Sequence, residues 1–136
     1  MTPDEWLLDE TREWVRRALN DLRAAELCAA ELPAEALFHC QQAVEKFLKA
    51  FLAWHQTPFR KTHELRELAM MCSGIDKTLE ASLEAAIALS QYAWRFRYPG
   101  APYEPDADEA ARGRALAEKV REVIGRRLPR FSTEAG

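Results

Sequence analysis

The 136-residue sequence is 48% apolar and 30% charged, with a net charge of −3, which suits a single folded domain. No apolar run approaches the ~20 residues of a membrane span, and the acidic N-terminus has no apolar core of a signal peptide. Valine and isoleucine number seven against twenty-three alanines, which disfavours a large β-sheet and predicts an all-α fold. The three cysteines form no CxxC pair and indicate free thiols in a reducing cytoplasm.

The first predicted helix begins at Pro3, inside a capping box formed by Thr2 and Glu5, and ends at Leu32-Pro33. A second helix is predicted over about 34–55. Its apolar residues cover most of the circumference, which is typical of the central helix of a bundle.

The polar residues of the second helix follow a spacing of three, four and three and therefore share one stripe: His39, Gln42, Lys46 and Lys49. Because the rest of the helix is apolar, we expect this stripe to face solvent or a cleft. It either lines a pocket for the phosphates of a nucleotide or RNA, or forms a solvated face that supports a Glu45–Lys49 pair.

A short third helix is predicted from His63 to about Cys72, with Thr62 as its cap and Ser73-Gly74 as its end. A fourth runs from Asp76 to about Arg97. His63, at a helix start, either meets an anionic ligand or packs locally against the loop.

The last helix follows a capping box at 106–109 and extends to Leu128. Four long helices and one short helix predict a single up-and-down bundle over residues 1–130, with a frayed tail at 131–136. Bundles with two metal ions carry two Glu-x-x-His pairs, and this sequence has none, nor any zinc-site spacing or glycine-rich phosphate loop. We therefore expect no metal site and no cofactor.

Four segments, in order, resemble the HEPN domain family, the nucleotide-binding domains of higher eukaryotes and prokaryotes. FHCQQAVEKFLKA at 38–50 is similar to that family's F-H-x-x-Q-A-x-E-K-x-L-K-A helix, THEL at 62–65 to its T-H-x-L, and RYP at 97–99 to its R-Y-P. Residues 14–27 resemble its A-x-x-D-L-x-x-A opening. The resemblance covers about residues 5–128.

The resemblance implies a helical domain that forms homodimers and often pairs with a minimal nucleotidyltransferase as a toxin–antitoxin system. Some relatives are metal-independent ribonucleases that use an R-x4–6-H motif, in which the histidine transfers protons and the arginine stabilises phosphoryl charge. Arg97 matches that arginine, but no histidine follows His63. Ribonuclease activity would require His39 or His63 to reach Arg97 in space, or Tyr103 to act instead.

Arginines and aromatic residues alternate over 92–98, a pattern typical of base stacking or of a dimer interface, of which we favour the dimer interface. We expect a homodimeric nucleotide- or RNA-binding module that pairs with a minimal nucleotidyltransferase and whose Tyr98 or Tyr103 would accept a nucleotidyl group. The expected binding residues are His39, Gln42, Lys46, Lys49, His63, Arg97 and Tyr98. The alternatives are a ribonuclease with Arg97 as its catalytic residue, and a purely structural interaction bundle.

Overall fold

Helices form all of the regular structure in the computed structural model, which describes residues 1–101 and 103–130. They are α1 (Pro3–Cys28), α2 (Pro33–Trp54), α3 (Leu65–Ile75), η1 (Lys77–Leu79), α4 (Glu80–Glu84), η2 (Ala85–Ala93) and α5 (Ala107–Gly125). The predicted all-α class is confirmed. The tail predicted to fray, 131–136, lies outside the described residues. Over the described part of the chain, no helix combines the length and the apolar character needed to cross a membrane.

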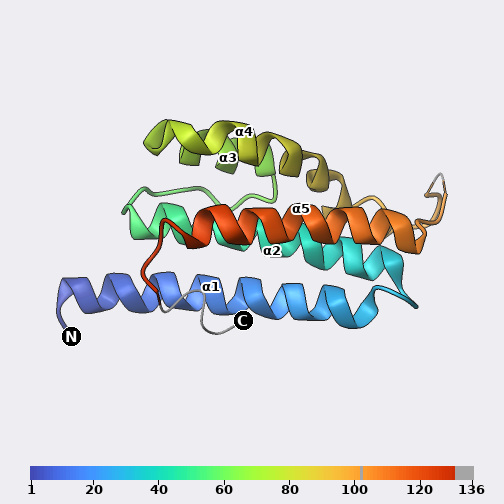
Figure 1. Cartoon of the computed structure of the whole chain (residues 1–136), viewed down its shortest axis with the longest axis horizontal. Coiled ribbons are helices and arrows are strands. Elements are labelled where there is room, and N and C mark those ends of the chain that lie inside the picture. The colour runs from blue at the N-terminus through green and yellow to red at the C-terminus, as the bar shows by residue number, and fades with distance from the viewer. Residues whose placement is uncertain (102, 131–136) are drawn as a thin grey trace.

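Helix α2 lies at the centre of the molecule, with α1 along one side, α5 alongside it and the α3–α4 layer opposite α1 (Figure 1). Fourteen of its 22 residues are buried, as its nearly continuous apolar surface predicts. Three of those buried residues are polar: Gln41, Glu45 and Lys49. Buried charges must be paired to be tolerated, so the centre of this bundle requires a polar network.

Most helix ends are fixed by hydrogen bonds between residues that are close in the sequence. The capping box of α1 is present, because Thr2 Oγ1 accepts from the Glu5 amide and the Glu5 carboxylate accepts from the Thr2 amide. Helix α2 ends in a Schellman motif, in which the Thr57 amide donates to the Leu52 carbonyl and Gln56 has a φ of 54°. Helix α1 ends at Cys28, four residues before the predicted stop.

The predicted long fourth helix is wrong. Residues 77–93 instead form a 3-10 turn, five residues of α-helix and a nine-residue 3-10 helix, η2. In η2 the buried residues Ala86 and Leu89 are three apart, and the half-buried Tyr92 continues that spacing. With three residues per turn, a 3-10 helix places all three on one line. Residues 1–101 and 103–130 therefore form three long helices and not four.

Helix α3 begins at Leu65, later than predicted, because Glu64 rather than Thr62 caps it. It continues through Ser73-Gly74 to Ile75. Asp76 caps the next turn as predicted, through the Thr78 amide. Asp106 caps α5, but the predicted capping box is incomplete, since the Glu109 carboxylate is engaged by tyrosine hydroxyl groups described below.

Candidate functional site: two carboxylate-centred clusters on α2

The first polar cluster joins α1 to α2 through one buried carboxylate, Asp21. Its Oδ1 accepts from His39 Nδ1 at 2.8 Å, and its Oδ2 accepts from Lys46 Nζ at 2.5 Å. His39 and Lys46 are seven residues apart and thus lie two turns apart on the same face of α2. Their side chains are 28% and 22% exposed, so this Asp21 cluster (Asp21, His39, Lys46) reaches the surface.

The second cluster repeats the arrangement one turn further along α2 and is almost wholly buried. Glu45 Oε1 accepts from His63 Nδ1 at 2.8 Å and from Gln41 Nε2 at 3.2 Å, and Glu45 Oε2 accepts from Lys49 Nζ at 3.1 Å. Gln41 Nε2 also donates to the His63 carbonyl. Only His63, with a side chain 68% exposed, reaches solvent from this Glu45 cluster (Gln41, Glu45, Lys49, His63).

Gln42 and Lys49, the remaining polar residues of the predicted stripe, make further contacts. Gln42 donates to the side-chain oxygen of Gln41 at 2.6 Å, which ties this residue of the exposed stripe to the Glu45 cluster. The Lys49 ammonium lies 5.5 Å from the ring centre of Trp14 and 5.7 Å from that of Phe59, a cation–π geometry. Lys49 is therefore held by a carboxylate and two aromatic rings, away from solvent.

Arg97 reaches the same side of the molecule from the segment after η2. Its guanidinium carbon lies 4.0 Å from the ring centre of Phe38. The Phe38 ring in turn meets the His39 ring edge-on, with 5.5 Å between the ring centres. Arg97 is exposed. The fold thus links an exposed arginine to the Asp21 cluster through the Phe38 ring, although Arg97 and His39 are far apart in the sequence.

The predicted stripe divides into two parts. His39, Gln42 and Lys46 are partly exposed, but Lys49 is buried, so the expectation that the whole stripe faces solvent or a cleft is wrong for Lys49. The expected Glu45–Lys49 pair is present, but it lies inside the bundle and not on a solvated face. His63 precedes α3 by two residues and belongs to the Glu45 cluster.

The binding residues expected from the sequence leave out the three that organise both clusters: Asp21, Gln41 and Glu45. Of these, the sequence predicts a contact only for Glu45, as the partner of Lys49. Asp21 carries a detectable signal, because it lies between Ala18, Leu22 and Ala25 on the apolar face of α1. A carboxylate at such a position needs a cationic or hydrogen-bonding partner from a neighbouring helix. The partner's identity follows only from how α1 packs on α2.

The HEPN domain family model matches residues 11–128 of the chain. The chain belongs to the HEPN domain family. This membership supports a nucleotide- or RNA-related role for the domain. Neither the curated proteins nor the solved structures contain a significant match to the sequence.

This HEPN domain has a tyrosine, Tyr103, near the position of the histidine in the R-x4–6-H motif. Tyr103 and Tyr92 both donate their hydroxyl hydrogens to Oε2 of Glu109, at 2.9 and 2.5 Å. The hydrogen bond to Glu109 raises the pKa of Tyr103 above its ordinary value, and burial together with Glu109 raises the pKa of Tyr92. A raised pKa makes the tyrosinate form still scarcer at neutral pH, which argues against Tyr103 as the proton acceptor.

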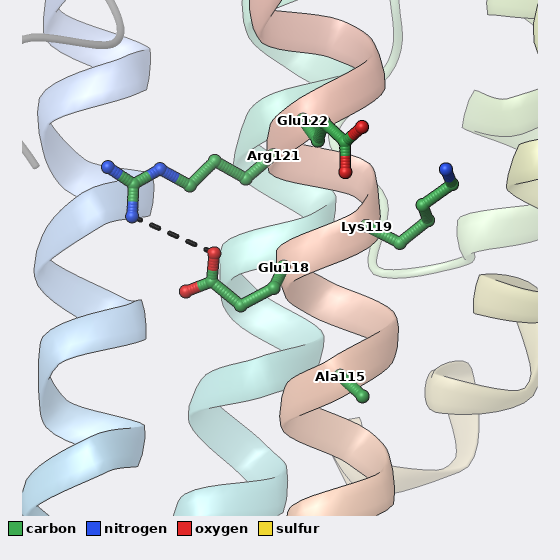
Figure 2. A pocket seen from close by; sticks show the side chains of 5 residues that line it. All are labelled: Ala115, Glu118, Lys119, Arg121 and Glu122. Carbon is green, nitrogen blue, oxygen red and sulfur yellow. Dashed lines mark ion pairs between the residues drawn. The ribbon is translucent and has the colours of Figure 1, made fainter.

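Two surface hollows of the HEPN domain are poor candidates for a phosphate site. One, of about 490 Å³, is lined by α5 alone (Figure 2). Its two acidic and two basic side chains offer no excess of positive charge. The Arg121 side chain extends toward α1 and pairs with Glu118, also on α5, at 3.7 Å. The other, of about 530 Å³, lies at the start of α2 and contains Tyr98. Three glutamates and no described cation line it: Glu31, Glu35 and Glu104.

In the part of the chain that the structure describes, no three His, Cys, Asp or Glu side chains gather into a group that would hold a metal ion. The three cysteines are free thiols. The Asp21 cluster brings an imidazole and an ammonium group together where both are partly exposed, and Arg97 is linked to His39 through the Phe38 ring. Tyr98 is next to Arg97 in sequence, but it lines the acidic hollow.

Proposed function

We propose that this HEPN domain binds the phosphates of a nucleotide or RNA at the surface formed by His39, Lys46 and Arg97. The observation that carries the proposal is the contact of the Arg97 guanidinium with Phe38, beside the Asp21 cluster. Arginine presents a planar set of donors to phosphate oxygens, and an aromatic ring under it leaves its edge free for them. Gln42 lies on the same stripe of α2 as His39 and Lys46, and its side-chain amide borders the proposed binding surface.

Charge supports this surface over the hollows. Lys46 uses one N–H for Asp21, and its partly exposed ammonium has two more to offer. The hollow beside Tyr98 carries three carboxylates, which repel phosphate. Of the residues expected from the sequence, Lys49 and His63 serve the Glu45 cluster, so their contribution to binding is indirect.

The binding test compares Arg97→Ala and Lys46→Ala with a matched control, Arg126→Ala. Arg126 is an exposed arginine at the C-terminal end of α5, where it pairs with Glu122. Anisotropy with a labelled 12-nucleotide RNA at two salt concentrations is the measurement. We expect each site variant to weaken binding about tenfold and to reduce the salt dependence, and Arg126→Ala to leave both unchanged. Equal affinities for all four proteins would contradict the proposed surface.

We also propose that the domain acts in the cytoplasm as a homodimer and pairs with a minimal nucleotidyltransferase, in the manner of a toxin–antitoxin system. Exposed aromatic residues near Arg97 support an interface there: Trp94 is 60% and Tyr98 is 70% exposed. Tyr98 is the better acceptor of a nucleotidyl group, because the Tyr103 hydroxyl hydrogen is donated to Glu109.

Light scattering of the purified chain tests the dimer, and Trp94→Ala is the variant expected to produce monomers. A pull-down from the native host, read by mass spectrometry, tests the partner. Recovery of a small nucleotidyltransferase in near-equal amount supports the pairing, and intact-mass analysis with Tyr98→Phe and Tyr103→Phe then identifies the acceptor. Recovery of the bait alone contradicts the pairing.

A metal-independent endoribonuclease is the second candidate, and the contact series from Arg97 through Phe38 to His39 favours it. It brings an arginine and a histidine to one surface without the R-x4–6-H spacing. In that reaction His39 Nε2 would take the 2′-hydroxyl proton and Arg97 would stabilise the phosphoryl charge. Arg97→Ala should abolish cleavage in EDTA without unfolding the domain, and cleavage that survives the change identifies a contaminant.

A further inference from the structure

A groove of about 380 Å³ lies between α3 and α4, on the side of the molecule away from α1 (Figure 1). Four apolar side chains line it: Ala69 and Met70 from α3, Leu83 from α4 and Ile87 from η2. Met70 is 67% exposed. Because Met70 adjoins the other apolar side chains of the groove, it belongs to an apolar patch and is not a single exposed residue.

Four charged side chains also line the groove, and they are separated by sign. The cations, Arg66 and Lys77, come from α3 and the turn that follows it, and the carboxylates, Glu80 and Glu84, come from α4. All four residues are exposed. None of the four side chains forms an ion pair with another described residue. The groove therefore has a basic side and an acidic side, and the charges of both are available to a partner.

A surface with one basic and one acidic side is complementary to a second copy of itself. In a two-fold symmetric contact, the same patch of each copy meets its counterpart. A two-fold axis along the groove sets α3 of each copy against α4 of the other, so that cations face carboxylates. A two-fold axis across the groove would set α3 against α3 and bring like charges together. Electrostatic complementarity therefore favours the first arrangement over the second.

We propose that two copies of this chain associate through the α3–α4 groove, with α3 of each copy facing α4 of the other and with Met70 covered by the contact. This contact is separate from the interface proposed around Trp94, because no residue of 92–98 lines the groove. A chain that carries both surfaces can contact two neighbours, so it assembles beyond a dimer.

The size of the groove indicates a weak contact. Helix α3 has 11 residues and is therefore only about 16 Å long. Contacts that bury little surface are typically transient. We therefore expect association through the groove at high protein concentration, whereas dilute Trp94→Ala protein remains monomeric, as expected above.

The test carries Trp94→Ala in every protein, which removes the other proposed interface, and measures association by sedimentation equilibrium over a series of concentrations. The acidic-groove variant adds Arg66→Glu and Lys77→Glu, and the basic-groove variant adds Glu80→Lys and Glu84→Lys. Each should self-associate at least about tenfold more weakly than the Trp94→Ala parent, because like charges meet across the contact. An equimolar mixture of the two variants should restore association, since every acidic groove can then meet a basic one.

The matched control adds Lys61→Glu and Lys119→Glu, two exposed lysines that do not line the groove. It has the same net charge as the acidic-groove variant but should self-associate like the parent. Its mixture with the basic-groove variant should associate more weakly than the acidic–basic mixture. Met70→Gln keeps every charge and removes the apolar contact, so it should also weaken self-association. Circular dichroism checks that each variant is folded.

Several results would overturn the proposal. One is a parent protein that stays monomeric over the whole concentration series, and another is an acidic–basic mixture that fails to associate. Undiminished self-association of the acidic-groove variant would place the contact elsewhere on the chain. Equal association of the two mixtures would identify attraction between net charges in place of a contact at the groove.

Discussion

His63 Nδ1, on a largely exposed side chain, lies 2.8 Å from Oε1 of Glu45, a carboxylate buried at the centre of the bundle. The other oxygen of Glu45 accepts from the buried ammonium of Lys49. A buried charge pair stabilises the fold less than the short distance between its two charges would suggest, since both groups lose their hydration on folding. Loss of one partner, however, leaves a buried charge without compensation.

We therefore expect Lys49→Met to destabilise the domain by about 3 kcal/mol. Methionine still packs against Trp14 and Phe59, so the loss isolates the charge and not the volume. The matched control is Arg23→Ala, which breaks an exposed pair with Glu26 and should cost no more than about 1 kcal/mol. Urea unfolding followed by circular dichroism measures both. Recovery of stability in the Glu45→Gln, Lys49→Met double variant would support the assignment, and equal losses in the two single variants would contradict it.

Asp76 links the end of α3 to the end of α5. Hydrogen bonds from Thr78 and Arg127 hold the pKa of its carboxyl below the ordinary value. A carboxyl with a lowered folded-state pKa stabilises the fold above its unfolded pKa of about 3.9, and that contribution is lost as the pH falls through the lower folded-state value. Asp76→Asn should thus be less stable than the wild-type protein at pH 7, and the difference should shrink below about pH 4.

The quantity to measure is the difference between the two unfolding free energies from pH 2 to 7. Glu13 also titrates at the acid end, because hydrogen bonds from Arg16 and Arg17 lower its pKa to about 2. Its contribution is present in both proteins and cancels in the difference. A gap between the two proteins that stays constant with pH would contradict the role given to Asp76.

The three cysteines should react at very different rates. Burial raises the pKa values of Cys40 and Cys72 to about 12, so their reactive thiolate forms are scarce at neutral pH. Cys28, at the end of α1, is half-buried. We expect a disulfide reagent at pH 8 to label one thiol of the native protein quickly and all three after unfolding. Cys28→Ser should remove the fast phase, and rapid labelling that persists in that variant would contradict the burial of the other two.

At Gly113 the backbone of α5 packs closely against a side chain of α2. A Cβ at this position would lie 2.6 Å from Leu37 Cδ2, and Leu37 is fully buried. Gly113→Val should therefore destabilise the domain by about 2 kcal/mol through overpacking. Gly74→Ala is the opposite control: it lies in α3 with nothing within 4 Å of a Cβ, and should stabilise by about 0.5 kcal/mol. Thermal unfolding distinguishes the two signs, and a stabilising Gly113→Val would contradict the close contact.

The sequence by itself determined the helical class, the central position of α2 and the caps at Thr2, Asp76 and Asp106, because these depend on composition, periodicity and contacts within one turn. It also carried the family motifs. It failed at residues 77–93. There the buried residues of η2 are three apart and η2 packs against α2, and this packing overrides the propensity of an alanine-rich segment for α-helix.

Only the tertiary structure decided how the polar residues of α2 are used. The spacing of His39, Lys46 and Lys49 puts them on one stripe, but it cannot say which of them meet a carboxylate, since Asp21 comes from α1 and the aromatic rings around Lys49 come from α1 and the loop after α2. Likewise, Arg97 meets Phe38 through the path of the segment after η2. Local periodicity fixes the direction of a side chain, whereas its partner and its burial are fixed by the helix packed against it.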